Sequence, residues 1–205
     1  MKEPFMKALA RPNPNPGGGA AAAYGVLVGF ALLKKVVRLE LNCRQILPEQ
    51  HRLWQDLLKK VNGLAEVLVE LRDEDGKTYL KMAKAKDSGR NSSEFASALQ
   101  ETIQCPIMIM ENTQKGLNCV ATAAENCRKH LLSDLLVVNQ LFRGAGIGAC
   151  YIAQANLMLM ADAKQQSDFR KTLRQHSEHC LKLFQEVQNT VFSRKKFLMN
   201  ADKIN

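Results

Sequence analysis

The feature that most constrains the fold is a long stripe of apolar residues spaced like one face of an α-helix. Steps of three or four residues separate Leu53, Leu57, Val61, Leu64, Leu68 and Leu71. A segment near the C-terminus has a similar pattern in Phe169, Leu173, Cys180, Phe184, Val187 and Val191. This periodicity is typical of amphipathic helices. Because strand-like alternation is nowhere convincing and aromatic residues make up only 6% of the chain, the sequence predicts an all-α fold, a multi-helix bundle of long antiparallel helices.

Two further long helices are predicted between these stripes. One covers Phe95–Asn126 and contains Pro106, which should kink or divide it. The other covers Ser133–Met160, as one long helix or two joined ones. A polar run at 86–93 predicts a loop that ends in a serine N-cap, and a second break is expected near 165–167.

The N-terminal third contains an uncharged segment, Pro12–Leu33, which raises the question of a leader or a membrane span. Its Pro- and Gly-rich first part cannot be helical. The apolar part, Ala20–Leu33, is shorter than the roughly 20 residues that a span needs, and it runs into Lys34 and Lys35. We therefore expect a buried core helix, no membrane partner and a cytoplasmic protein.

Length and charge indicate how the chain is organised. A chain of 205 residues is the size of one domain, expected over residues 1–193 and followed by a basic tail at 194–205. The net charge of +9 is compatible with anionic partners, from nucleic acid to a small polyanion. Because the tail lacks aromatic or Arg-rich company, nucleic acid is not predicted as a partner.

The cysteines and histidines do not form a metal-binding pattern. No two of the six cysteines are spaced C-x-x-C, and the four histidines do not complete a zinc motif. His176 and His179 could present two ligands on one helical face, but a solvated surface is favoured. The prediction is a set of reduced thiols and no metal site.

Asp75 is the first candidate for chemistry. Continuing the stripe of the long helix past Leu71 at steps of three or four leads to Asp75, Tyr79 and Met82, whereas Asp73 falls off the stripe. A carboxylate on an apolar face costs free energy unless it is paired or protonated. Such a group is either a general acid or base, because burial moves its pKa towards neutrality, or a structural carboxylate that caps a helix or pairs with a cation.

Glycines before the first long helix are the second candidate. Gly17, Gly18 and Gly19 precede Ala20, and glycines at a helix start let a ligand approach the first free N–H groups. No Lys-Ser/Thr follows, which excludes a P-loop. A flexible cap is the alternative and is favoured on spacing alone.

Two features fall within the fourth predicted helix. Ser133 and Asp134 could cap its start. Farther on, glycines and alanines at 144–153 form ridges of small residues that let another helix or a flat ligand come close. Helix packing is the usual use of such ridges.

These features occur together, in order, in one known family. The chain resembles the cyclodeaminase domain of formiminotransferase-cyclodeaminase and the bacterial methenyltetrahydrofolate cyclohydrolases, over Phe5–Asp162. The matching elements are Pro16–Ala23, Cys43-Arg44, Asp73-Glu74-Asp75 with Tyr79, Cys105-Pro106-Ile107, Ser133-Asp134, and Gly148-Ala149 followed by Ile152 to Leu157.

The resemblance implies a function and a set of site residues. It implies a helical homodimer that acts on 5-formimino- or 5,10-methenyl-tetrahydrofolate, with the folate as substrate and no metal or redox cofactor. Asp75 aligns with the family's proton acceptor. The substrate-binding residues that it implies are Arg44 for the glutamate carboxylate, Gly17, Gly18, Gly19 and Asn156 along the pocket, and Ser133 with Asp134 towards the pterin.

The sequence also departs from the family pattern, at Lys35, Glu40, Cys43, Cys127-Arg128 and Ile152. Ile152 replaces an Asn and cannot hydrogen-bond a pterin edge, and Glu40 would repel a folate carboxylate if it lay nearby. The alternative is therefore a catalytically degenerate helical homodimer that binds folate weakly or serves as a protein-interaction module.

Overall fold

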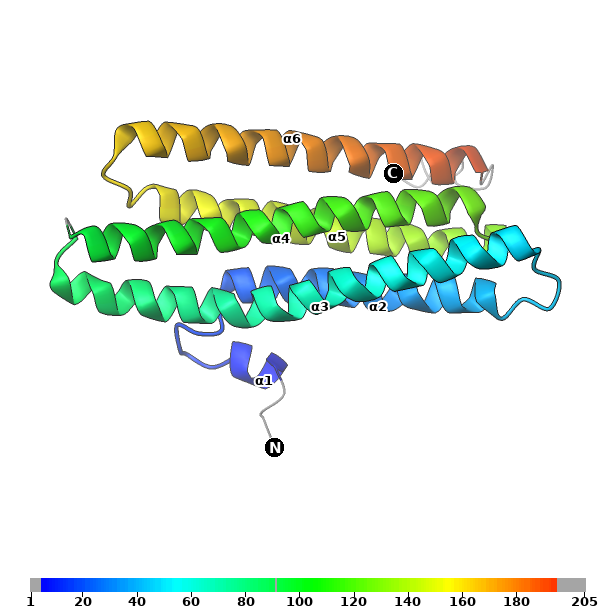
Figure 1. The fold of residues 1–205 in the computed structure, drawn as a ribbon, viewed down its shortest axis with the longest axis horizontal. Helices are drawn as coiled ribbons and strands as arrows, with labels where there is room; N and C mark the ends of the chain where they lie inside the picture. Colours follow the sequence, from blue (N-terminus) through cyan, green and yellow to red (C-terminus); the bar gives the residue numbers. More distant parts are fainter. Residues whose placement is uncertain (1–4, 91, 195–205) are drawn as a thin grey trace, which may run out of the picture.

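The fold is a bundle of five long helices with a short helix beside it (Figure 1). The computed structural model describes residues 5–90 and 92–194. The helices are α1 (Phe5–Leu9), α2 (Gly18–Leu41), α3 (Pro48–Ala85), α4 (Ser93–Asn126), α5 (Leu132–Leu157) and α6 (Ala163–Arg194), with one-turn 3₁₀ helices at Lys86–Ser88 and Lys129–Leu131. The described ranges contain no strand. The prediction of an all-α bundle is confirmed. Of the predicted basic tail, only Arg194 is described, as the last residue of α6, and 195–205 lie outside the described residues.

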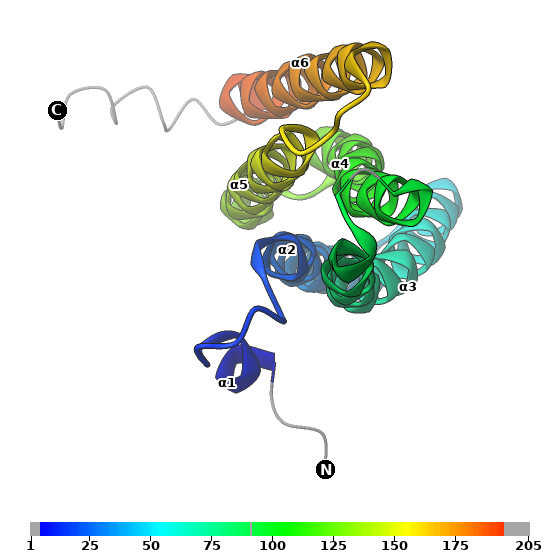
Figure 2. The ribbon, with the colours of Figure 1, turned by 90° about the vertical axis from the view of Figure 1, so that its left-hand side faces the viewer.

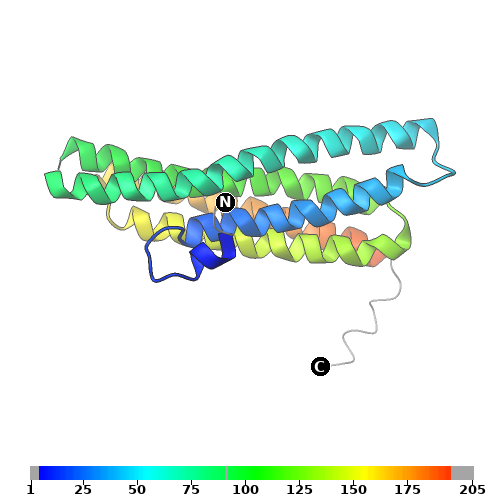
Figure 3. The ribbon, with the colours of Figure 1, turned by 90° about the horizontal axis from the view of Figure 1, so that it is seen from below.

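Short connections make each long helix antiparallel to the one before it (Figure 1). Viewed end-on, α2 and α5 form one side of the bundle and α3 and α4 the other, and α6 packs against α4 and α5 (Figure 2). Figure 3 shows α1 beside α2, where Phe5 stacks on Tyr24 with 4.5 Å between ring centroids.

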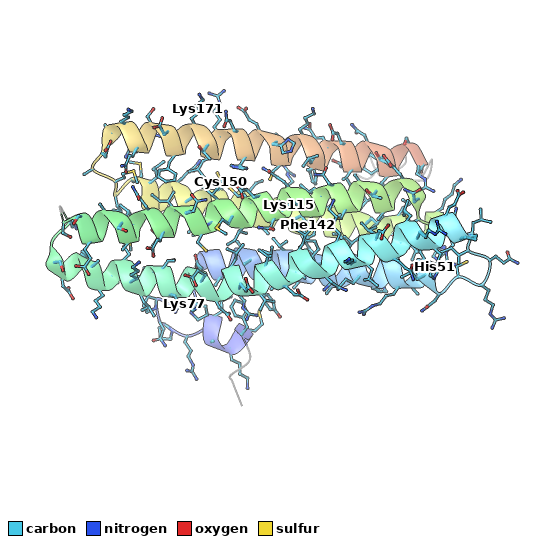
Figure 4. The ribbon with its side chains drawn as sticks, viewed as in Figure 1. His51, Lys77, Lys115, Phe142, Cys150 and Lys171 are labelled. Atoms are coloured by element: carbon cyan, nitrogen blue, oxygen red, sulfur yellow. The ribbon has the colours of Figure 1, made fainter. Side chains whose placement is uncertain are left out.

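The core is built around Phe142 of α5, which is fully buried (Figure 4). Its ring meets Phe30 edge-on at 5.0 Å between centroids. Glycines in two facing helices make room for it, because a Cβ at Gly29 would lie 2.5 Å from the ring and one at Gly116 would lie 2.7 Å from it. These contacts tie α2, α4 and α5 together at mid-length.

Pro106, which was expected to kink or divide its helix, lies inside an undivided α4. One predicted loop differs from the observed one. The last loop ends earlier than 165–167, because the Asp162 carboxylate accepts the backbone N–H groups of Lys164 and Gln165, each at 2.9 Å, and α6 has begun by Ala163. The predicted helix at Ser133–Met160 is one helix and not two joined ones, and its observed bounds are those of α5, Leu132–Leu157.

Two of the helices combine length with strong apolar character. By length and composition alone, α2 and the stretch Lys129–Leu157 are long enough and apolar enough to cross a membrane. The expectation that the first apolar segment is too short therefore does not hold. Its assignment as a core helix does, because α2 packs against α3 and α5 and buries Val26, Phe30 and Leu33 completely.

His176 differs from its prediction as part of a solvated face. It is half-buried against α4, where its Nδ1 lies 3.1 Å from Gln114 Nε2 and its Nε2 lies 3.5 Å from Glu111 Oε1. His179 is exposed. In the described part of the chain, no three His, Cys, Asp or Glu side chains gather as metal ligands would.

Candidate active site at the start of helix α2

The Asp75 carboxylate reaches across from α3 to the first turn of α2. Its Oδ2 accepts the backbone N–H of Ala20 at 2.9 Å. The N-cap residue of α2 is Gly17, which has no side chain to satisfy the free N–H groups of this turn. Asp75 thus caps a helix distant in sequence, which is the structural role that the sequence left open beside the catalytic one.

The close approach of the two helices depends on Gly19. A Cβ built on this residue would lie 1.9 Å from Asp75 Oδ1, so no other amino acid fits without a shift. At Gly18 a Cβ would lie 2.7 Å from the tip of Ile152. The space left by the missing side chain of Gly19 is therefore occupied by the Asp75 carboxylate of the same chain.

Burial raises the pKa of the Asp75 carboxyl above its ordinary value, and the hydrogen bond from Ala20 only partly opposes this. Its neighbour Cys105 is more strongly affected, because burial and then the charges of Asp75 and Glu74 raise its pKa to about 12. Cys105 is therefore a thiol at neutral pH and no candidate nucleophile. Of these two groups, Asp75 is the candidate for proton transfer, because burial raises its pKa from an acidic starting value.

Asp75 lines a pocket of about 200 Å³. Its walls come from the α1–α2 loop, the start of α2, and parts of α3, α4 and α5: Pro14, Asn15, Gly17, Gly18, Gly19, Asp75, Gly76, Thr78, Tyr79, Thr102, Ile152 and Asn156. Five predicted site residues, the three glycines with Asp75 and Asn156, thus lie together.

Asn156 is held in this pocket by a main-chain group that sequence reasoning missed. Its Nδ2 donates to the Thr102 carbonyl at 2.9 Å. In a regular helix that carbonyl would accept the N–H of residue 106, but Pro106 has none. The sequence therefore did contain a sign of this free carbonyl, because a proline inside a helix removes the hydrogen bond to the carbonyl four residues before it.

The other three predicted site residues lie elsewhere. Arg44 is exposed in the α2–α3 loop, and Ser133 and Asp134 lie in the first turn of α5. About six turns of α5, or about 33 Å, separate Asp134 from Asn156. Ser133 is exposed and does not cap α5, which begins one residue earlier. Within one chain, the predicted substrate-binding set is therefore split between the two ends of the bundle.

Near the start of α5, three residues that depart from the family pattern, Lys35, Glu40 and Arg128, contact a predicted site residue or one another. Lys35 Nζ lies 3.1 Å from Asp134 Oδ2. The buried Glu40 accepts the backbone N–H of Arg128 at 2.9 Å and its Nε at 3.2 Å. The substitutions at 40 and 128 therefore form one ion pair, in which the charge of Glu40 is compensated and lies far from Asp75.

Comparisons with known proteins agree with one another. The sequence profile of the family described as formiminotransferase-cyclodeaminase matches residues 1–175. The methenyltetrahydrofolate cyclohydrolase of Methylorubrum extorquens is 30% identical over 140 residues, covering 64% of this chain and 67% of that protein. The crystal structure of formiminotetrahydrofolate cyclodeaminase from Thermotoga maritima superposes with a TM-score of 0.84 at 19% identity, covering 92% of this chain and 94% of that one. At that identity, the structural likeness speaks for the fold alone.

Proposed function

Because the chain belongs to the formiminotransferase-cyclodeaminase family, we propose that it is a folate one-carbon enzyme in which Asp75 carries the proton. The observation that supports this most directly is the half-buried Asp75 carboxyl, with a raised pKa, in the wall of a pocket. General acid–base catalysis favours a group with a pKa near the working pH.

On 5-formiminotetrahydrofolate the reaction closes a ring. N10 attacks the formimino carbon, a new N10–C bond forms, and the electron pair of the C=N bond moves to the imino nitrogen. The Asp75 carboxylate takes the proton from N10. Asp75 then returns this proton to the departing nitrogen, which also takes one proton from solvent. The C–N bond breaks to release ammonia and leave the 5,10-methenyltetrahydrofolate cation.

On 5,10-methenyltetrahydrofolate the same group serves hydrolysis. Asp75 takes a proton from water as its oxygen adds to the methenyl carbon. It returns that proton to the ring nitrogen whose bond to this carbon breaks, and the hydroxyl proton leaves to solvent as the formyl C=O forms. Neither reaction requires a metal or a redox cofactor, and we propose none.

The methenyl chromophore tests both reactions. The purified chain is incubated with 5-formiminotetrahydrofolate, where cyclodeaminase activity makes the methenyl absorbance rise. In a second cuvette with 5,10-methenyltetrahydrofolate, cyclohydrolase activity makes it fall faster than in buffer. Asp75→Asn should slow whichever change is seen. Rates equal to buffer in both cuvettes would refute the enzyme proposal.

A degenerate binding protein is the second candidate, and Ile152 is the observation that favours it. Its apolar side chain lies against Gly18 in the pocket wall, where the family pattern has an Asn. Calorimetry with 5-formyltetrahydrofolate separates the candidates. Heat of binding without turnover supports a degenerate folate-binding protein, and no heat at millimolar ligand supports an interaction module.

A further inference from the structure

The pocket around Asp75 needs a group that can recognise the flat edge of a pterin. This edge is a lactam, in which an N–H donor and a C=O acceptor stand side by side. A carboxylate only accepts hydrogen bonds and a guanidinium only donates them, whereas a primary amide offers one acceptor and one donor in the matching arrangement. Ile152 makes one wall of the pocket apolar, so the amide has to come from another wall.

Most polar side chains of the pocket wall are already held within the chain. The Asp75 carboxylate caps α2. Thr78 Oγ1 donates to the Asp75 carbonyl at 3.0 Å, and Thr102 Oγ1 donates to the Leu99 carbonyl at 2.7 Å. Asn156, one of the two amides in the wall, has its nitrogen held by the Thr102 carbonyl. The remaining amide is therefore the candidate for recognising the lactam.

This amide belongs to Asn15, in the loop between α1 and α2. It is half-buried, and it has no hydrogen-bond partner among the described residues. A Cβ built on Gly76 would lie 2.2 Å from Asn15 Oδ1, 2.5 Å from Nδ2 and 2.7 Å from Cγ. Because these three distances are similar, the amide lies flat against Gly76, one residue along α3 from Asp75. Its oxygen and its nitrogen are both available to a ligand in the pocket.

The chain around Asn15 restricts where its amide can go. Asn15 stands between two prolines, whose rings limit the backbone conformations on both sides of it. The preceding α1 contacts two long helices, because Phe5 stacks on Tyr24 of α2 and the Arg72 guanidinium of α3 lies 5.7 Å from the centre of the Phe5 ring. A side chain that is already held in place loses less conformational entropy when a ligand binds.

Resting on the proposed function, we propose that Asn15 is a specificity-determining residue of the folate site, positioned by Gly76. Its Oδ1 accepts the lactam N–H of the pterin, and its Nδ2 donates to the lactam oxygen. In a pterin, the lactam carbonyl carbon is bonded to the carbon that carries N5. Because Asn15 lies beside Asp75 in the pocket, pairing with the lactam brings the one-carbon unit at N5 towards the Asp75 carboxyl.

Asn15→Leu tests this pairing, because Leu has nearly the shape of Asn and forms no hydrogen bond. Calorimetry with 5-formyltetrahydrofolate should show that Kd rises by about 10- to 100-fold, as expected for the loss of one or two buried hydrogen bonds. The matched control is Asn13→Leu. Asn13 also stands between two prolines of this loop, but it is exposed and does not line the pocket. Its Kd should equal that of the wild type.

Turnover separates recognition from a purely structural role. The lactam pairing is the same in the ground state and the transition state, so Asn15→Leu should raise KM by the same factor as Kd and change kcat by less than about threefold. A fall in kcat at unchanged KM would point to a displaced Asp75 and refute the inference. If the wild type binds folate and the two Leu variants have equal Kd, the inference is refuted and the proposed function stands. A wild type that neither binds nor turns over folate would refute both.

Gly76→Ala tests how the amide is positioned. The new methyl group meets the Asn15 amide, so Kd should rise by at least about tenfold while the helical circular dichroism signal is retained. In an Asn15→Ala background there is no amide to displace, and the same substitution should leave Kd unchanged. The control is Gly63→Ala in the same helix, where a Cβ would meet nothing within 4 Å. An equal rise in both backgrounds would mean that the methyl group blocks the ligand itself, which would refute positioning by Gly76.

Discussion

At the scale of single residues, Asp75 combines an observed structural role, as the cap of α2, with the proposed role in proton transfer. The hydrogen bond from Ala20 to Oδ2 favours the charged carboxylate, while burial favours the neutral acid. Because burial is the larger effect, the carboxyl keeps a proton to a higher pH than an exposed Asp does. If hydrogen bonds fully satisfied the charged carboxylate, its pKa would fall and it would be a weaker base.

Asp75→Asn should keep the fold and lower turnover by about 10²–10⁴-fold. The Asn carbonyl oxygen can still accept the Ala20 N–H, but it cannot take up a proton. Asp73→Asn is the control, because Asp73 is exposed and forms an ion pair with its neighbour Arg72. Equal losses in both variants, or an unfolded Asp75→Asn protein, would show that Asp75 is a structural carboxylate.

The pKa of Asp75 also predicts how stability depends on pH. A folded-state pKa above the unfolded value means that the folded state binds the proton more tightly. The resulting stabilisation is complete below the unfolded pKa of about 3.9 and is lost as the pH rises through the folded pKa. Relative to Asp75→Asn, the wild type should therefore lose unfolding free energy in urea titrations as the pH rises above about 4 and through the folded pKa. A difference that grows in favour of the wild type with pH would contradict the burial argument.

Ile152 tests whether the pocket still binds a pterin. Ile152→Asn places a hydrogen-bonding amide in the wall beside Gly18 and should tighten 5-formyltetrahydrofolate binding by about one to two decades in Kd. Calorimetry measures the change, and Ile152→Val, which adds no polar group, is the control. Equal affinities in all three proteins would mean that position 152 does not contact the ligand.

At the scale of helices, the sequence predicted which elements exist better than where their ends and contacts lie. The stripe from Leu53 to Leu71 falls on the buried or half-buried side of α3, and its extension reached Asp75 correctly. Periodicity reports one face of one helix. It carries no information on which backbone group lies opposite, so the Ala20 cap and the Thr102 contact to Asn156 could not be derived from it.

Pro106→Ala should show that a missing N–H in α4 positions Asn156. The new N–H donates to the Thr102 carbonyl and turns it towards the helix axis, which weakens its contact with Asn156. We expect α4 to be stabilised by about 1 kcal/mol and KM to rise by about 3- to 10-fold. In an Asn156→Ala background, the same substitution should leave KM unchanged, and an equal rise there would exclude this path.

At the scale of the whole molecule, the family resemblance predicts a set of site residues but not how they are arranged in space. The order of the motifs along the chain placed Arg44, Ser133 and Asp134 in the same set as Asp75. Asp134 and Asn156 lie near opposite ends of α5, a helix of 26 residues, so they are far apart within one chain. No periodicity argument could have shown that the set is divided between two ends.

The homodimer that the family resemblance implies predicts a stability that depends on protein concentration. If folded protomers associate and unfolded chains do not, mass action raises the urea midpoint as protein concentration increases. Sedimentation equilibrium should give twice the chain mass of 22.9 kDa at micromolar concentration. A urea midpoint independent of concentration, together with the monomer mass, would contradict the prediction.

The Thr102 carbonyl that Pro106 leaves free also has a consequence for how the site can change through mutation. A main-chain oxygen is present whatever amino acid the codon for position 102 specifies, so substitutions at that position leave the acceptor of Asn156 in place. The contact is instead encoded at position 106, in a residue that does not line the pocket. A single nucleotide change there can retune the pocket while every residue in its wall stays the same.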